Sequence, residues 1–290
     1  MQWLTKLLSQ SAKPVIKAQT GNTALYPSRG DIVKRNELFT LDYTHKNEGY
    51  VIGTYTGDIF KKCRVRITHK DGGFNFAALR DDRAVFPLTY GDGRYKIEAL
   101  QQIEGSKYKS ILSLTIDIKL RDKLLPNLYP NTYVNYTKGS LCVTVANELC
   151  AGMVTTEQKS KAIYNWIMRN IKYDQQKAIK LSNDAESGHW FIPNPDEVIK
   201  TGKCICFGYA SLLAAMHRSQ GIPCRIAIGN MGTRHAWNEL YWDTGGALNK
   251  YIYIPAKKFT TVDITLTLSI GDKKVAELIA GNNYTTEYRG

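Results

Sequence analysis

Hydrophobic and polar residues alternate along two segments of the first 125 residues. Apolar side chains occupy every second position in residues 63–67 and again in residues 112–120. This period of two residues is typical of strands that bury one face. Residues 70–73 read Lys-Asp-Gly-Gly and residues 90–93 read Tyr-Gly-Asp-Gly, which predict hairpin turns between such strands. The pattern therefore predicts a small antiparallel β-sandwich.

The organisation of the chain changes near residue 125, where two turn-forming sequences follow each other. Residues 125–127 read Leu-Pro-Asn and residues 129–131 read Tyr-Pro-Asn. We place a domain boundary there, because 290 residues also exceed the usual size of one domain. Residues 1–30 are then an N-terminal extension, residues 31–125 a β-sandwich-like domain and residues 126–290 a second domain.

Helical spacing dominates after this boundary. Apolar residues recur at helical intervals from Ile163 to Ile171, and Thr155 with Gln158 predicts a capping box at the start of that helix. Residues 206–219 are apolar on nearly every side, which predicts a buried central helix that stops at Gly221. Four short β-type runs follow and predict an antiparallel sheet on that helix, at residues 225–228, 235–242, 251–254 and 259–268. The predicted fold class is α+β.

Composition narrows the possible partners. The chain has 39 Lys and Arg against 26 Asp and Glu, a formal net charge of +13, which favours anionic surroundings. No signature of a nucleic-acid-binding domain accompanies this charge, so nucleic acid is not an expected partner, whereas an anionic cell-wall polymer stays open. No stretch approaches the roughly 18 apolar residues that cross a bilayer, and residues 1–8 contain no intact secretion signal.

Three side chains in the second domain form a candidate catalytic triad. Cys206 begins the predicted central helix, where the partial positive charge of unpaired N–H groups favours a thiolate and can stabilise an oxyanion. His235 begins the predicted strand at residues 235–242, where its imidazole can take the proton of the thiol. Asp263 lies in the predicted strand at residues 259–268 and can fix the tautomer of that imidazole. The arrangement predicts a cysteine nucleophile.

The same residues carry a family resemblance. Residues 203–213 (Lys-Cys-Ile-Cys-Phe-Gly-Tyr-Ala-Ser-Leu-Leu), 221–225 (Gly-Ile-Pro-Cys-Arg), 235–239 (His-Ala-Trp-Asn-Glu) and 262–265 (Val-Asp-Ile-Thr) follow in the order of the motifs of the bacterial transglutaminase-like superfamily, which this part of the chain resembles. The resemblance places the nucleophile at Cys206 rather than Cys204, with His235 and Asp263 as its partners. Ile264 departs from the Pro that is frequent there.

The resemblance implies a papain-like α+β fold in which a central helix packs on an antiparallel sheet. It also implies attack on a carboxamide, a thioester acyl-enzyme, and an amine or water as acceptor. The expected substrate is a protein or peptide with Gln-like amides, and no cofactor or metal is expected. Because the β-rich half resembles the leading domain of secreted Gram-positive members, the expected location is extracellular or the cell surface, with the cytoplasm as the alternative.

Other interpretations of the same residues stay open. A lone cysteine on an apolar helix is often an inert hydrophobe. A metal site at Cys204, Cys206, Cys224 and His235 lacks the paired spacing of structural zinc sites. A cysteine peptidase or amidase using water, and a non-catalytic cell-surface binding module, are the alternative functions. Trp190 or Tyr173 is a candidate second donor to an oxyanion.

Overall fold

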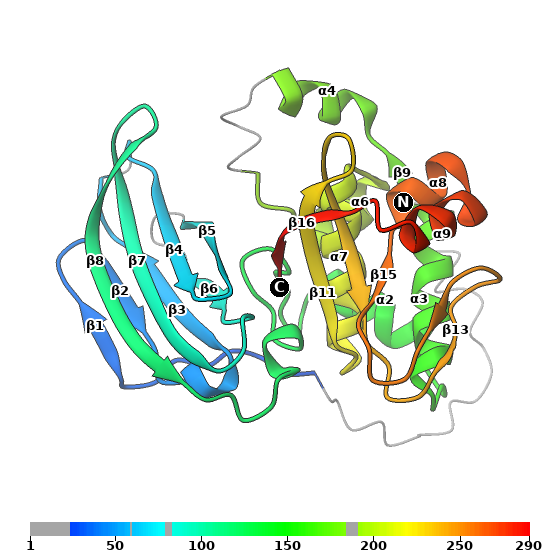
Figure 1. The fold of residues 1–290 in the computed structure, drawn as a ribbon, viewed down its shortest axis with the longest axis horizontal. Coiled ribbons are helices and arrows are strands. Elements are labelled where there is room, and N and C mark those ends of the chain that lie inside the picture. The colour runs from blue at the N-terminus through cyan, green and yellow to red at the C-terminus, as the bar shows by residue number, and fades with distance from the viewer. Residues whose placement is uncertain (1–23, 59, 79–82, 184–190) are drawn as a thin grey trace.

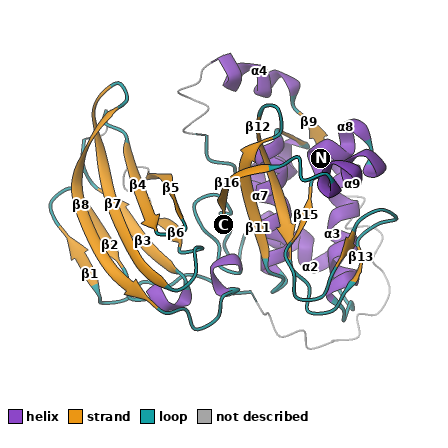
Figure 2. Cartoon of the chain, in the orientation of Figure 1, coloured by secondary structure: helices purple, strands orange, loops and turns teal. Residues whose placement is uncertain are grey.

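A computed structural model describes residues 24–58, 60–78, 83–183 and 191–290 of the chain. Two lobes lie side by side in Figure 1. The first lobe consists almost entirely of strands, and the helices gather in the second lobe, as the colouring of Figure 2 shows. The structure is therefore α+β, in agreement with the predicted fold class.

Two four-stranded antiparallel sheets build the first lobe. One has the order β1-β2-β3-β6, and the other has the order β5-β4-β7-β8. Apolar residues from both sheets, such as Leu41 and Val65, belong to one buried cluster. The two sheets therefore pack on a shared core, as in the predicted β-sandwich. The strands are β1 (Val33–Arg35), β2 (Phe39–Asp42), β3 (Tyr50–Tyr55), β4 (Cys63–His69), β5 (Gly72–Ala78), β6 (Ala84–Pro87), β7 (Gly93–Glu104) and β8 (Lys107–Ile118).

One of the two predicted hairpins is correct and the other is wrong. The turn at residues 70–73 joins β4 to β5, which pair antiparallel. The turn at residues 90–93 connects β6 to β7, but β6 pairs with β3 and β7 pairs with β4 and β8. Turn residues fix only the reversal of the chain, whereas burial of the following strand decides which sheet it joins.

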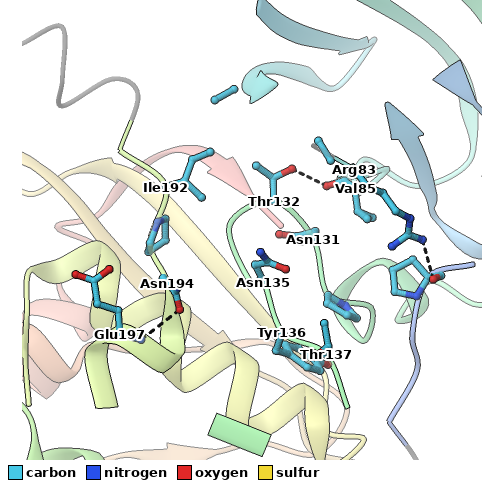
Figure 3. Close-up of a pocket in the computed structure, with 15 residues that line it drawn as sticks. Arg83, Val85, Asn131, Thr132, Asn135, Tyr136, Thr137, Ile192, Asn194 and Glu197 are labelled. Atoms are coloured by element: carbon cyan, nitrogen blue, oxygen red, sulfur yellow. Dashed lines mark hydrogen bonds between the residues drawn. The ribbon is translucent and has the colours of Figure 1, made fainter. Parts of the chain in front are cut away.

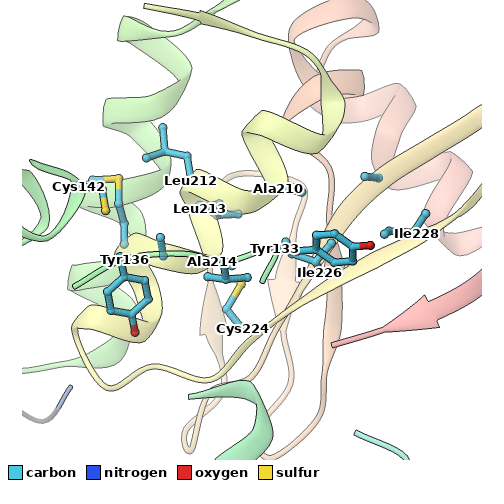
Figure 4. Packing of buried hydrophobic residues seen from close by; sticks show 14 of the residues in the cluster. Tyr133, Tyr136, Cys142, Ala210, Leu212, Leu213, Ala214, Cys224, Ile226 and Ile228 are labelled. Atoms are coloured by element: carbon cyan, nitrogen blue, oxygen red, sulfur yellow. The ribbon is translucent and has the colours of Figure 1, made fainter. Parts of the chain in front are cut away.

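The second lobe is organised around α7 (Cys206–Ser219). Residues 208–219 of this helix are all buried, as the apolar pattern predicts. In Figure 4 the α7 residues Leu212 and Leu213 lie between Cys142 on one side and Ile226 on the other. Cys142 belongs to α2 (Leu141–Leu149) and Ile226 to β11 (Cys224–Asn230), so helices cover one side of α7 and the sheet covers the other.

The sheet beside α7 has the order β15-β12-β11-β16, with every neighbouring pair antiparallel. Its other strands are β12 (Arg234–Leu240), β15 (Thr260–Val262) and β16 (Thr285–Arg289). The C-terminal strand β16 is absent from the sequence prediction, which instead assigns residues 251–254 to this sheet. In the structure β14 (Tyr253–Ile254) pairs with β13 (Gly246–Ala247) in a separate two-stranded sheet.

The predicted strand at residues 259–268 is wrong beyond Val262. The sequence Ile-Thr-Leu-Thr-Leu alternates like a strand, but α8 (Ile264–Ile270) begins immediately after Asp263. Asp263 is the N-cap of α8, and its side chain accepts a hydrogen bond from the backbone N–H of Leu266. A satisfied N-cap stabilises a helix start and here outweighs the strand preference of the β-branched residues.

The helix predicted near Ile163 is present as α3 (Thr156–Asn170), with the predicted capping box between Thr155 and Gln158. The remaining short elements are β9 (Lys172–Tyr173), α4 (Gln175–Asn183), α6 (Pro195–Thr201), β10 (Lys203–Cys204), α9 (Asp272–Ala280), and the 3-10 turns η1 (Lys46–Glu48) and η2 (Leu125–Asn127). The boundary placed at residue 125 falls between the last sandwich strand and α2, and the exact domain limits stay a prediction.

Candidate active site

Cys206 occupies the first position of α7 and is the most accessible thiol of the chain. The other five cysteines are buried, Cys206 is half-buried, and all six are free thiols within the described residues. Ile205 is the N-cap of α7 and makes no side-chain capping hydrogen bond. The first backbone N–H groups of a helix lack intrahelical acceptors, so the amide of Cys206 is available to a reacting oxyanion.

Cys204, two residues earlier, has a different environment. It is 3% exposed, and burial raises the pKa of its thiol far above the ordinary range. A Cβ added at Gly208 would lie 2.5 Å from the Cβ of Cys204, so glycine at this position lets the Cys204 side chain pack against the first turn of α7. A buried thiol with a raised pKa is a poor nucleophile, which favours Cys206 for that role.

His235, on β12, connects Cys206 to Asp263. Its Nε2 atom lies 2.7 Å from Oδ2 of Asp263, and its side chain also hydrogen-bonds with Cys206. Burial lowers the pKa of the imidazole, but the hydrogen bonds to Asp263 and Cys206 and the charges of both groups outweigh it, raising the pKa of His235 to about 10. The ring is therefore an imidazolium at neutral pH, which can pair with a thiolate.

Asp263 holds this ring through a carboxylate that is 1% exposed. Its Oδ1 accepts from Leu266 N at 2.9 Å, the N-cap bond of α8, while Oδ2 faces His235. The cap fixes the carboxylate, and pairing of Val262 with Asn238 aligns β15 with the strand that carries His235. The residue sits at a strand end rather than within a strand, which corrects the sequence-based placement.

Tyr284 is a site residue that sequence reasoning missed. Its hydroxyl donates to Oδ2 of Asp263 at 3.1 Å, and its ring packs edge-on against Trp237 with centroids 4.9 Å apart. Burial and the Asp263 charge raise the pKa of Tyr284, so the hydroxyl keeps its proton and remains a donor. Tyr284 lies 21 residues after Asp263, in a segment without a motif, so only the tertiary structure reveals it.

Of the two candidate oxyanion donors, Tyr173 lies within the described residues. Tyr173 lies on β9 and is 42% exposed. Burial raises the pKa of its hydroxyl, and the charges of Cys206 and Cys204 raise it further. Trp190 lies outside the described residues. The donor role of Tyr173 stays a prediction.

The structure thus brings together the three side chains that the sequence singles out. Outside this group, His217 is fully buried with its Nδ1 2.9 Å from the carbonyl oxygen of Leu213, and Trp166 and Trp237 are core residues. The catalytic roles of Cys206, His235 and Asp263 stay predictions, because their geometry alone does not measure turnover.

A family model described as the transglutaminase-like superfamily matches residues 143–257. This range contains Cys206 and His235 and ends before Asp263. The human Kyphoscoliosis peptidase is 26% identical over 145 residues, which are 46% of this chain and 20% of that protein. The chain therefore spans about a fifth of the length of this curated relative.

Two solved structures show low overall similarity. A proposed cysteine protease from Cytophaga hutchinsonii is 15% identical, with a TM-score of 0.42 over 90% of this chain and 74% of that one. Red sea bream transglutaminase is 9% identical, with a TM-score of 0.27 over 74% of this chain and 48% of that one. The matched part of the chain, residues 143–257, is a domain of the transglutaminase-like superfamily.

Proposed function

We propose that this chain is a cysteine-dependent enzyme that attacks carboxamide or peptide bonds and forms a thioester acyl-enzyme. The observation that carries the proposal is the position of His235, which is hydrogen-bonded to Asp263 at 2.7 Å and also to Cys206. A nucleophile, a base within hydrogen-bonding reach and a group that orients the base are the three parts of such a site.

In the first step, the Cys206 thiolate attacks the carbonyl carbon and a C–S bond forms. The C–N bond then breaks, and the His235 imidazolium gives its proton to the leaving amine. The amide of Cys206 stabilises the oxyanion that forms on attack. In the second step, neutral His235 takes a proton from the acceptor, which attacks the thioester. The C–S bond breaks, and the thiolate is restored beside an imidazolium.

The acceptor distinguishes two reactions of the same site. Transfer to an amine is transglutaminase-like acyl transfer, and transfer to water is peptidase or amidase activity. The name of the human relative supports water, and the family match supports either. A non-catalytic binding module is less well supported, because such a module does not need His235 placed between Cys206 and Asp263.

The substrate we propose is a protein or peptide carrying Gln-like amides. The net charge of +13 supports an anionic cell-wall polymer as a further partner, and we propose an extracellular or cell-surface location. In the described part of the chain, no helix combines the length and apolar character that crossing a bilayer needs.

A glutamine-containing peptide incubated with a fluorescent primary amine tests the reaction. Mass spectrometry of the peptide separates three products: the amine adduct, the deamidated peptide and the cleaved peptide. We expect one or more of these with the native protein and none with Cys206→Ala. Cys204→Ala is the matched control and should keep activity, since Cys204 is buried. Equal product formation by native protein and Cys206→Ala would contradict the proposal.

A further inference from the structure

A serine, a histidine and a glutamate at the first lobe lie in hydrogen-bonding order, outside the Cys206 site. Oγ of Ser28 lies 3.1 Å from Nε2 of His45, and Nδ1 of the same ring lies 3.2 Å from Oε2 of Glu48. Ser28 is exposed, whereas His45 and Glu48 are partly buried, so a ligand can reach the serine from solvent. A nucleophile, a base and a carboxylate that orients the base are the parts of a hydrolytic triad.

The 3-10 turn η1 brings His45 and Glu48 together. His45 is the N-cap of this turn, and the N–H of Glu48 donates to the carbonyl of His45 at 2.9 Å. Side chains three residues apart eclipse each other in a 3-10 turn, so the imidazole and the carboxylate lie on the same side. Gly49 then ends the turn in the left-handed region, with φ at 91°. The pairing of base and carboxylate therefore follows from local structure.

Glu48 fixes which nitrogen of His45 carries the proton. An ionised carboxylate only accepts hydrogen bonds, so in the neutral ring Nδ1 carries the proton and the lone pair of Nε2 faces the hydroxyl of Ser28. The carboxylate is itself held, because Arg121 pairs with its Oε1 at 3.1 Å and the hydroxyl of Tyr129 donates to its Oε2 at 3.2 Å. This polarity is the one that a base needs in order to take the serine proton.

Tyr50 aligns the histidine and the serine with each other. Its ring stacks on that of His45 with centroids 5.3 Å apart, and its hydroxyl accepts from the N–H of Ser28 at 3.1 Å. Tyr50 is 2% exposed, so both contacts rest on a packed side chain of β3. One rigid ring therefore positions both the base and the nucleophile.

The chain on either side of Ser28 is tied to the sandwich. Before it, Arg83 donates to the carbonyl of Pro27 at 2.7 Å, the hydrogen bond drawn as a dashed line from Arg83 in Figure 3. After it, the N–H of Gly30 donates to Oδ2 of Asp42 at 2.8 Å. Because the segment is held on both sides, the hydroxyl of Ser28 stays within reach of the imidazole.

The N–H of Arg29 is available to an oxyanion. The N–H groups of Ser28 and Gly30 have acceptors, whereas among the described residues no acceptor faces the N–H of Arg29. In hydrolases with a serine nucleophile, the N–H of the residue after the serine commonly belongs to the oxyanion hole. Arg29 therefore supplies the part of the site that stabilises charge on the attacked carbonyl.

We propose that Ser28, His45 and Glu48 form a second hydrolytic site, which cleaves carboxylic esters with small acyl groups. Because Ser28 is exposed, the site gives a substrate few contacts, which suits an ester with a good leaving group better than an amide. The inference is independent of the reaction that Cys206 performs.

The reaction takes two steps. The hydroxyl oxygen of Ser28 attacks the ester carbonyl while Nε2 of His45 takes its proton, and the bond to the alcohol oxygen then breaks as His45 gives that proton to the leaving alcohol. Water then attacks the acyl-serine, again with His45 taking the proton. The bond from the acyl group to Ser28 breaks, the proton returns to the serine oxygen, and a carboxylic acid is released.

A fluorophosphonate probe on Cys206→Ala protein tests the site, because that variant removes the thiol of the other site. The Ser28 oxygen displaces fluoride from phosphorus, and peptide mass spectrometry locates the adduct. We expect an adduct at Ser28 that forms about 100-fold or more slowly in His45→Gln and at least about tenfold more slowly in Glu48→Gln. Ser110, an exposed serine of β8 with no hydrogen bond to a histidine among the described residues, should stay unlabelled.

Turnover is measured with p-nitrophenyl acetate on the same Cys206→Ala protein. We expect more than one equivalent of p-nitrophenolate for each protein molecule, a release that Ser28→Ala abolishes and Ser110→Ala leaves unchanged. Absence of an adduct at Ser28, equal labelling of Ser110, unchanged labelling in His45→Gln or turnover that survives Ser28→Ala would each overturn the proposal. Ser28→Ala removes only an exposed hydroxyl, so it stays decisive even where His45→Gln fails to fold.

Discussion

Asp263 does two things with one carboxylate, and both depend on its position at the junction of β15 and α8. Oδ1 caps α8 through Leu266, and Oδ2 receives His235 and Tyr284. The cap and the site therefore share one rigid group. Buried carboxylates that accept several hydrogen bonds hold their orientation well, which is what an orienting residue in a triad needs.

Asp263→Asn should lower the reactivity of Cys206 at low pH. Because the folded pKa of His235 is raised to about 10, the imidazolium persists across neutral pH and is lost only as the pH rises through that value. Without the Asp263 carboxylate, the imidazolium is lost at lower pH and no longer favours a thiolate. We expect iodoacetamide labelling of Cys206 near pH 6 to slow by about tenfold or more, with native and variant rates converging above the free-thiol pKa of about 8.5.

Peptide mass spectrometry of the labelled protein gives this rate for Cys206 separately. Asp272→Asn is the matched control, because Asp272 also accepts side-chain hydrogen bonds, from Tyr164 and Asn249, but does not contact His235. Unchanged labelling of Asp263→Asn across the pH range would show that Cys206 is an ordinary thiol.

Tyr284→Phe should reduce turnover with little loss of stability. Phenylalanine keeps the edge-on packing against Trp237 and removes only the hydroxyl that donates to Asp263. The carboxylate then holds His235 less firmly, and we expect about a tenfold fall in kcat. Tyr241→Phe, whose ring packs on Phe259, is the control, and equal activity of both variants would remove Tyr284 from the site.

At the scale of elements, α7 positions Cys206 by being anchored at its other end. Arg218 is fully buried and donates to the carbonyl of Cys224 at 2.9 and 2.7 Å and to that of Tyr129 at 2.7 Å. One side chain thus ties the last turn of α7 to the start of β11 and to the segment between the lobes. Burial lowers the pKa of Arg218, which shows how much the interior disfavours this charge.

Arg218→Met should therefore destabilise the fold by about 3 kcal/mol, because the carbonyls of Cys224 and Tyr129 lose their donor inside the core. Methionine fills similar space, so the loss reports mainly on hydrogen bonding. Urea unfolding followed by circular dichroism measures the change in free energy. Arg169→Met, on an exposed position of α3, should cost less than about 0.5 kcal/mol. A loss at Arg218 no larger than this control would refute the anchoring role.

At the scale of the whole molecule, the C-terminal strand joins the two lobes. Tyr288 on β16 packs against Phe74 and Phe76 of β5, with ring centroids 4.3 and 5.5 Å apart. Tyr133, from the connecting segment, lies 6.4 Å from Tyr288 and 5.0 Å from Phe207, the residue after Cys206. These contacts form a chain of aromatic rings from the sandwich to the start of α7.

Tyr288→Ala should uncouple the lobes. Deleting a buried aromatic side chain costs about 3 to 5 kcal/mol, and here the lost contacts cross the interface. We expect differential scanning calorimetry to show a lower first transition and a broadened or split profile. Tyr253→Ala, at a residue that is 62% exposed, should leave a profile like that of the native protein. A single transition at the native temperature in Tyr288→Ala would show that the lobes fold independently of this contact.

The elements that could be predicted from the sequence are those held by interactions between residues close together in the chain. The capping box at Thr155 and the apolar run of α7 are set by residues within a few positions of each other, and both are present as predicted. The error after Val262 arose because the cap at Asp263 and the alternating residues behind it favour different structures. The partner of β7 and the place of β16 depend on residues far away in the chain, which a local pattern does not record.

The sequence by itself determined the α+β class, the buried central helix and the three residues that meet at the site, because these features rest on short-range periodicity and compact motifs. Only the tertiary structure decided that Cys204 is buried while Cys206 is accessible, and that Tyr284 donates to Asp263. The physical reason is that burial and hydrogen-bond partnership are properties of neighbours in space, which the order of residues along the chain does not specify.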